Sequence, residues 1–271
     1  MPELPEVQTI VNELERVLPG KRIKSCRVLR DNIVKGDQHR FGQQVKNKNI
    51  SKIERRGKYI VITLSSSQVI IVHLRMTGKF IFQPLTSPAQ KHDRVVFELQ
   101  NQQKLIFSDV RCFGTLELVN DINKHIGLSQ LGFDPWSPQL TVGILQKKLK
   151  NRQIPIKTAL LDQKLIAGLG NIYASEILFD AGIRPDIPAN QLTLGKLASI
   201  IRSMRKILSL ALKYNGTSIS DYRRIDEKQG MFQNFLKVYG KAEQKCINCS
   251  SSIMKITQNQ RSTFLCPGCQ K

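Results

Sequence analysis

The chain begins MPELPEV, a stretch in which a proline stands next to two carboxylates. Once Met1 is removed, Pro2 carries a free amine; with an α-amine pKa of about 7.7–8.0, roughly a tenth of it is unprotonated at pH 7. An unprotonated amine can attack an electrophilic carbon, and at a sugar C1′ a secondary amine would give a charged iminium that drives a later elimination. Glu3 could act as its general acid or base, and Glu6 lies one helical turn further on.

Taken alone, these residues also fit a purely structural role. Proline favours the first turn of a helix, and glutamates stabilise its positive end. The spacing of the following apolar residues predicts a helix over 5–18 that ends at Pro19-Gly20. Its apolar face would consist of Val7, Ile10, Val11, Leu14 and Val17.

Four of the six cysteines form two C-x2-C pairs that are separated by residues 250–265: Cys246, Cys249, Cys266 and Cys269. This spacing is typical of a tetrahedral structural zinc site, whereas two disulfides are the weaker alternative in a reducing compartment. The sequence therefore predicts one structural zinc ion. We interpret Cys26 and Cys112 as small core thiols.

The charge of the chain points to a polyanionic partner. Its 271 residues carry a formal net charge of +21, and nucleic acid is the first candidate because each neutralised phosphate releases counterions. An anionic membrane surface is the second, but no apolar run approaches the roughly 18–20 residues that span a bilayer. The N-terminus lacks the features of a signal peptide. We expect a cytoplasmic protein, nucleoid-associated if the source is a bacterium.

The patterning predicts an α+β protein. Seven short β-branched runs recur from about residue 22 to 120, which is typical of a β-sandwich or barrel. They are RIKSCRVL, KYIVITL, QVIIVHL, KFIFQ, RVVFEL, KLIFSDV and GTLELV. The proline-containing stretch 131–140 resembles a linker. The second half is helical, with predicted helices near 141–150, 157–162, 171–182 and 193–214. Asn171 is the expected N-cap of the third of these helices, in a helix-turn-helix arrangement whose N–H groups could bind phosphate. A polar loop over 215–230 precedes the cysteine pairs.

Several segments together resemble the bacterial formamidopyrimidine-DNA glycosylases (Fpg) over the whole chain. In the order and spacing of that family they are PELPEV (2–7), RRGKY (55–59), HLRMTGKF (73–80), DVRCFGT (109–115), GLGNIYASEILF (168–179), VYGK (238–241) and QRSTFLCPGCQ (260–270). The related endonuclease VIII begins differently after Pro-Glu. The resemblance implies an N-terminal catalytic β-sandwich domain (1–130), a linker (131–140), a helix–two-turn–helix DNA-binding domain (141–235) and a zinc finger (236–271).

The resemblance also implies roles for the matching residues. Pro2 would be the nucleophile, Glu3 the proton donor to the sugar ring oxygen, and Glu6 a carboxylate that supports proton handling. Lys58 matches a catalytic lysine that touches the phosphate beside the lesion. Arg261 matches the zinc-finger arginine that clamps phosphates, although Gln260 and Ser262 stand where the family usually has glycines.

Six further residues would contact DNA. The resemblance implies that a void-filling trio occupies the gap left by an extruded nucleotide, that one of the trio reads the opposite base, and that the other residues hold phosphates or the lesion. The trio is Met76, Arg111 and Phe113, and the others are His73, Lys157 and Asn171.

The predicted activity is a bifunctional DNA glycosylase and abasic-site lyase of base excision repair. It would excise 8-oxoguanine and formamidopyrimidines through an N-terminal proline Schiff base and cleave the strand by β,δ-elimination. Its partner would be double-stranded DNA with an oxidised base or an abasic site, and we expect a monomer without an organic cofactor. Two alternatives stay open: an endonuclease VIII-like enzyme for oxidised pyrimidines, and a zinc-ribbon protein that binds DNA without chemistry.

Overall fold

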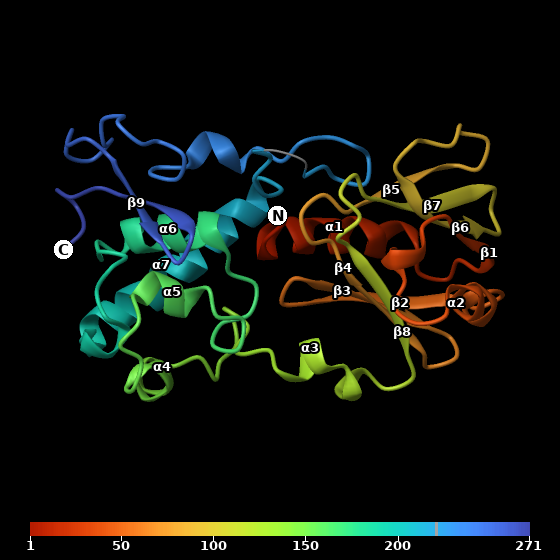
Figure 1. Ribbon diagram of the computed structural model, residues 1–271, viewed down its shortest axis with the longest axis horizontal. Helices are drawn as coiled ribbons and strands as arrows, with labels where there is room; N and C mark the ends of the chain where they lie inside the picture. The colour runs from red at the N-terminus through yellow and green to blue at the C-terminus, as the bar shows by residue number, and fades with distance from the viewer. Residues whose placement is uncertain (220–221) are drawn as a thin grey trace. The chain divides into compact units, whose positions relative to one another are not determined.

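Contacts among residues 1–219 and 222–271, the residues that the computed structural model describes, divide the chain into two units. The first consists of Met1–Ser129 and Tyr214–Met231, and the second of Gln130–Lys213 and Phe232–Lys271 (Figure 1). Residues 131–140 therefore group with the second unit, and 214–231 return to the first. The predicted loop over 215–230 includes Ser220 and Asp221, which lie outside the described residues. The proposed domain boundaries stay a prediction.

Within the described residues, the first unit holds two antiparallel sheets of four strands each. One sheet has the order β1 (Ile23–Val28), β6 (Asp93–Leu99), β7 (Gln103–Ser108) and β5 (Lys79–Pro84). The other has the order β2 (Ile50–Arg56), β3 (Tyr59–Leu64), β4 (Val69–His73) and β8 (Thr115–Val119). These sheets confirm the β-sandwich predicted for this half of the chain.

One core joins the two sheets to helix α1 (Leu4–Val17), which packs against β2 and β3 (Figure 1). Alternate residues of β3, Ile60 and Ile62, point into this core, as a strand period of two requires. From α1, Val7, Ile10 and Leu14 are fully buried in it. The sandwich thus fixes the helix whose first turn carries the predicted chemistry.

Strand β2 and helix α2 are among the elements of this unit that were not predicted. Strand β2 carries charged residues at 52 and 54–56, which mask its two buried apolar positions, Ile50 and Ile53. Helix α2 (Gln38–Val45) is short and mostly polar, but it buries Phe41 and is capped by Asp37, whose carboxylate accepts the Arg40 N–H at 3.0 Å.

The second unit contains the predicted helices α4 (Val142–Leu149), α5 (Ile156–Leu160), α6 (Asn171–Asp180) and α7 (Leu194–Lys213). Helix α6 contacts α5, α7 and the hairpin of β9 (Met254–Gln258) and β10 (Arg261–Leu265), as Figure 1 also shows. Seven consecutive residues of α6, 173–179, are buried. A helix buried all round is the central element of a unit. None of the helices in the described parts of the chain is long and apolar enough to span a membrane.

The predicted N-cap role of Asn171 is wrong. Gly170 occupies the cap position in extended conformation, and Asn171 is the first helical residue. The Asn171 amide is engaged elsewhere, because its Nδ2 donates to the Ser262 carbonyl at 2.9 Å and its Oδ1 accepts from the Lys157 ammonium at 2.6 Å.

Glu176 anchors the approach to the cysteine pairs. Its buried carboxylate accepts the backbone N–H groups of Lys237, Val238 and Tyr239 at 2.8–2.9 Å. Burial raises the pKa of this carboxyl, and the three N–H groups act in the opposite direction. The carboxylate thereby holds on α6 the segment 237–239, which precedes the cysteine pairs in the chain.

Replacing Glu176 by alanine should therefore destabilise the second unit by roughly 1–3 kcal/mol for each N–H group left buried without a partner. Glu176→Gln should lose less, because one amide oxygen can still accept the N–H groups of Val238 and Tyr239. Denaturant unfolding of both variants beside wild type measures the difference. Equal stability of Glu176→Ala and wild type would contradict the anchoring role.

Candidate active site and nucleic-acid interface

The N-terminal turn of α1 holds Pro2, Glu3 and Glu6 close together, and all three are buried. Glu3 is the extended residue ahead of the helix and forms a capping box with Glu6, whose Oε2 accepts the Glu3 N–H at 2.7 Å. Met1 precedes Pro2, so the Pro2 nitrogen is an amide that stands in for the amine of a processed chain. The predicted nucleophile and proton donor are neighbours on a rigid helix end.

Glu6 also binds the segment that returns to the first unit. Its Oε1 accepts the Thr217 N–H at 2.8 Å. Gly216, which precedes Thr217, has a φ of +77°. A Cβ added to Gly216 would lie 2.7 Å from Glu6 Oε1. Only glycine fits a left-handed backbone this close to the carboxylate. Glu6 therefore links the backbone beside the predicted nucleophile to residues 216–217, a positioning role that was not predicted from the sequence.

A second carboxylate of α1 holds the same returning segment further along. Glu13 accepts a short hydrogen bond from the Arg224 guanidinium and a 3.1 Å bond from the Ile225 N–H. The Ile225 carbonyl in turn accepts the Phe82 N–H of β5 at 3.3 Å. Residues 222–225, expected to belong to a loose polar loop, are therefore fastened to α1 and β5.

Lys58 lies in the two-residue turn that joins β2 and β3. Gly57 takes the first position of this turn with φ +59°, the pattern of a type II′ hairpin turn. Arg55 braces the turn, since it donates to the Gly57 carbonyl at 3.1 Å and to Oε1 of Gln8 on α1 at 2.8 Å. The Lys58 side chain is only 6% exposed and thus well fixed.

His73 ends β4 as a buried, neutral imidazole. Burial, with the nearby charges of Arg75 and Lys58, lowers its pKa to about 3. Its Nδ1 accepts the Arg75 N–H at 3.0 Å, which leaves Nε2 as the ring donor. The Tyr59 ring packs edge-on against it, with 4.7 Å between ring centroids. A contact with DNA through this residue would be a neutral hydrogen bond rather than an ion pair.

The predicted void-filling trio occupies two turns of the first unit. Met76 is 38% exposed and Phe113 is 52% exposed, which is unusual for large apolar side chains. The Arg111 guanidinium lies over the Phe113 ring at 4.8 Å from its centroid, a cation–π contact. These side chains are available to an external partner instead of being part of the core.

In the second unit, Lys157 and Asn171 meet the zinc-finger hairpin. The Lys157 ammonium is almost fully buried and donates to Asn171 Oδ1 at 2.6 Å, to Thr263 Oγ1 at 2.7 Å and to the Ser262 carbonyl at 3.1 Å. Lys157 therefore ties α5, α6 and β10 together. Its predicted contact with the base and phosphate stays a prediction, while this geometry gives it a positioning role.

Arg261 stands exposed at the start of β10, directly after the hairpin turn. Gln258 and Arg261 pair, so the turn consists of Asn259 and Gln260, with φ of +45° and +60°. Two left-handed residues form a type I′ turn, although Gln260 stands where the family resemblance leads us to expect glycine. A tight turn therefore forms here without glycine, and Arg261 and Lys157 line a common hollow of about 250 Å³.

The four cysteines of the two C-x2-C motifs satisfy the requirements of a zinc site. Their sulfur atoms all lie within 4.8 Å of one another, with 3.7 Å between Cys246 and Cys269 and 3.3 Å between Cys249 and Cys266. Zn–S bonds of 2.3 Å in a tetrahedron require about 3.8 Å between sulfurs. A zinc ion held by these thiolates would fix the β9–β10 hairpin and Arg261, and would have no open coordination position.

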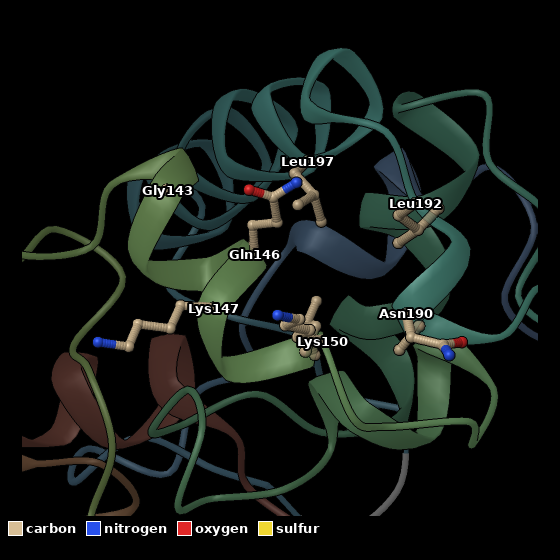
Figure 2. A pocket seen from close by; sticks show the side chains of 9 residues that line it. Gly143, Gln146, Lys147, Lys150, Asn190, Leu192 and Leu197 are labelled. Atoms are coloured by element: carbon tan, nitrogen blue, oxygen red, sulfur yellow. The ribbon is translucent and has the colours of Figure 1, made fainter.

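A larger hollow of about 420 Å³ lies between α4 and residues 189–197 (Figure 2). Buried leucines and the polar side chains of Gln146, Lys150 and Asn190 line it. Among the described residues, none that the sequence analysis selected for chemistry or DNA contact borders this hollow. We do not assign it to the active site.

Thr77, Asp109 and Thr217 were not predicted from the sequence to belong to the site. Each is a buried polar residue next to a predicted site residue in the chain or in space. Thr77 and Asp109 lie inside two of the segments that carry the family resemblance, which was the available signal. Thr217 had no comparable signal, because only the fold brings it to Glu6.

Removal of the metal should unfold the hairpin, because structural zinc supplies folding free energy at this size. We expect Cys266→Ala to lose bound zinc, measured by elemental mass spectrometry, and the amides of 254–265 to lose hydrogen-exchange protection. Cys26→Ala is the matched control and should keep the metal. Full protection of the hairpin in a zinc-free Cys266→Ala protein would refute a structural zinc.

Gln260→Gly should stabilise the hairpin turn. The left-handed conformation of a residue with a Cβ is unfavourable by about 1–2 kcal/mol. Ordering the more flexible glycine costs about 0.5–1 kcal/mol of conformational entropy, which offsets part of the gain. The expected gain is slower hydrogen exchange of the β9–β10 amides. The control is Ser262→Gly, at a residue outside the left-handed region, which should not slow exchange. Faster exchange in Gln260→Gly would show that the turn is not strained.

Comparison with known proteins covers the entire chain. Residues 1–116 match the model of the formamidopyrimidine-DNA glycosylase N-terminal domain, residues 131–223 that of the formamidopyrimidine-DNA glycosylase H2TH domain, and residues 243–271 a zinc finger found in FPG and IleRS. A formamidopyrimidine-DNA glycosylase of Rickettsia conorii is 41% identical over 271 residues, which are 100% of this chain and 99% of the relative. One from Carboxydothermus hydrogenoformans is 41% identical, with 100% of both chains covered.

Solved structures agree with these matches. A Lactococcus lactis FPG mutant in complex with DNA containing Fapy-dG superimposes with a TM-score of 0.94, at 36% identity and with 100% of each chain covered. The wild-type Lactococcus lactis FPG in complex with DNA containing an oxidised pyrimidine gives a TM-score of 0.92, also at 36% identity and full coverage. Sequence, domain order and fold lead to one conclusion: this chain belongs to the formamidopyrimidine-DNA glycosylase family.

Proposed function

We propose that the chain is a DNA glycosylase and abasic-site lyase of base excision repair that acts on oxidised purines. The observation that carries the proposal is the buried Pro2-Glu3 pair at the start of α1, in a chain that matches the family over its full length. The partner would be double-stranded DNA with 8-oxoguanine, a formamidopyrimidine or an abasic site. The relatives in solved complexes hold DNA of this kind.

The chemistry begins at the amine that Pro2 gains when Met1 is removed. The neutral amine attacks C1′, a C–N bond forms, and the glycosidic bond breaks with its electron pair leaving on the base, which takes up the proton that the amine nitrogen gives up. Glu3 donates its proton to the ring oxygen as the sugar opens, which yields the iminium. The iminium then accepts the electrons released by β-elimination and δ-elimination, and the strand is cut on both sides of the sugar.

The remaining predicted residues would hold the extruded nucleotide. Lys58, in its braced turn, and Arg261, at the tip of the zinc hairpin, would bind the phosphates that flank it, and Asn171 would contact a phosphate from the start of α6. Charged donors bind phosphates through strong hydrogen bonds. Zinc would keep Arg261 in place and take no part in bond breaking, because four thiolates leave no site for water.

An enzyme for oxidised pyrimidines is the second candidate. It rests on one observation: the wild-type Lactococcus lactis relative is seen with an oxidised-pyrimidine DNA. Paired assays on 8-oxoguanine and thymine glycol duplexes would separate the two, and equal or reversed preference would favour this alternative.

Given the net charge of +21, we further propose that the protein acts as a monomer associated with the nucleoid.

Borohydride reduction tests the nucleophile directly. Reduction of the iminium in the presence of damaged DNA should give a covalent protein–DNA adduct in wild type, and intact mass spectrometry should show that Met1 is absent. Pro2→Gly should slow adduct formation strongly, since it replaces the secondary amine by a primary one in a more flexible backbone. Glu3→Gln should lose base excision, because the amide cannot donate the proton.

Glu15→Gln is the matched control, since Glu15 lies on the same helix near its other end. It should form the adduct at the wild-type rate. Absence of the adduct in wild type, or an active protein that retains Met1, would refute the proline mechanism. Normal excision by Glu3→Gln would refute the role of Glu3 alone.

A further inference from the structure

Asp109 follows β7 as a completely buried carboxylate that has no role in the proposed chemistry. Burying a charged carboxylate is unfavourable unless hydrogen bonds compensate for the lost water. The hydrogen bonds that compensate for the burial of Asp109 therefore show which backbone segments this carboxylate holds in place.

The carboxylate closes the turn that follows it. Its Oδ1 accepts the Arg111 N–H at 3.1 Å, and its Oδ2 accepts the Gly114 N–H at 2.7 Å. Between these two donors the chain passes through Cys112, whose φ of +54° is left-handed. An uncommon conformation of this kind persists where the surroundings determine it, here through hydrogen bonds on both sides.

The same carboxylate reaches a second turn through Thr77. The Thr77 hydroxyl donates a short hydrogen bond to Asp109 Oδ1 and accepts the Arg111 N–H at 3.0 Å. Thr77 is buried and follows Met76 directly in the chain. The Met76 turn and the Arg111–Phe113 turn thus share one hydrogen-bond cluster.

Packing joins the two turns at a second point. Gly78 and Gly114 both face the tip of the Phe107 ring, where an added Cβ would lie 2.9 Å and 2.5 Å from its Cζ. Neither turn can shift without disturbing that ring or the other turn. Side chains on the two turns are therefore held at a fixed separation.

We infer that the Thr77–Asp109 pair is a positioning device that presents Met76, Arg111 and Phe113 as one preformed wedge. The inference rests on the proposed function. Because the wedge must enter a base stack and face the opposite base, its geometry decides how well the enzyme acts on duplex DNA and how well it distinguishes the opposite base. Chemistry on an abasic site in a single strand needs no wedge.

Thr77→Val and Thr77→Ser form the decisive pair, because valine removes the hydroxyl at nearly constant volume and serine retains it. Displacement of a positioned group by about 1 Å can cost 10²-fold in rate. We expect Thr77→Val to lose roughly 10- to 100-fold in kcat/KM on an 8-oxoguanine duplex, and to discriminate less between opposite cytosine and adenine. Its lyase activity on a single-stranded abasic oligonucleotide should stay within about twofold, and Thr77→Ser should approach wild type on both substrates.

Fluorescence of 2-aminopurine opposite the lesion adds a readout of wedge insertion, and its rise should be lost in Thr77→Val. Unchanged duplex activity and base discrimination in Thr77→Val, or an equal loss on duplex and single strand, would overturn the inference. If Thr77→Val does not fold, Asp109→Asn decides under the same criteria, since its amide cannot accept both N–H groups. A wild-type protein that gives no borohydride adduct on the single strand would refute the proposed function instead.

Discussion

The hydrogen bonds of the Glu6 carboxylate determine much of the catalytic end of this molecule. One oxygen holds the N–H of Glu3 and the other holds the N–H of Thr217, two backbone groups that are more than two hundred residues apart. Because the carboxylate is buried, losing either donor would leave a charge poorly compensated. The start of α1 and residues 216–217 consequently depend on each other, and this fixes the backbone next to the proposed nucleophile, Pro2.

Other buried carboxylates among the described residues also organise backbone, and three of them hold longer segments. Glu13 fixes residues 224–225, Glu176 fixes 237–239, and Asp109 fixes the turn over 109–114. Each accepts N–H groups from a segment without regular secondary structure, which the sheets and helices cannot satisfy. The chain has 42 basic and 21 acidic residues. Because several of the acidic side chains are buried and hydrogen-bonded to the backbone, they do not neutralise the basic side chains that can bind a polyanion.

Apolar periodicity made most of the fold predictable from sequence. The helical spacing of apolar residues located α1, and β-branched runs located seven of the eight strands described in the first unit. The four helices of the second unit were predicted as well, although α6 buries residues 173–179 all round rather than on one face. Strand β2 was not predicted, because the charged residues around Ile50 and Ile53 obscure its apolar pattern. The zinc ligands followed from spacing alone. The partners of Glu6, Lys157 and Asp109 could not be predicted, since Thr217, Thr263 and Thr77 reach them only through tertiary structure.

The first unit is discontinuous in the chain, and this affects how the protein is made. Residues 1–129 leave the ribosome long before 214–231, so Glu6 and Glu13 wait for their partners while the whole second unit is synthesised. A nascent chain arrested before residue 217 contains the Glu6 and Glu13 carboxylates but not the groups that donate to them from residues 217–225. The start of α1 can therefore acquire these hydrogen bonds only after most of the chain has been synthesised.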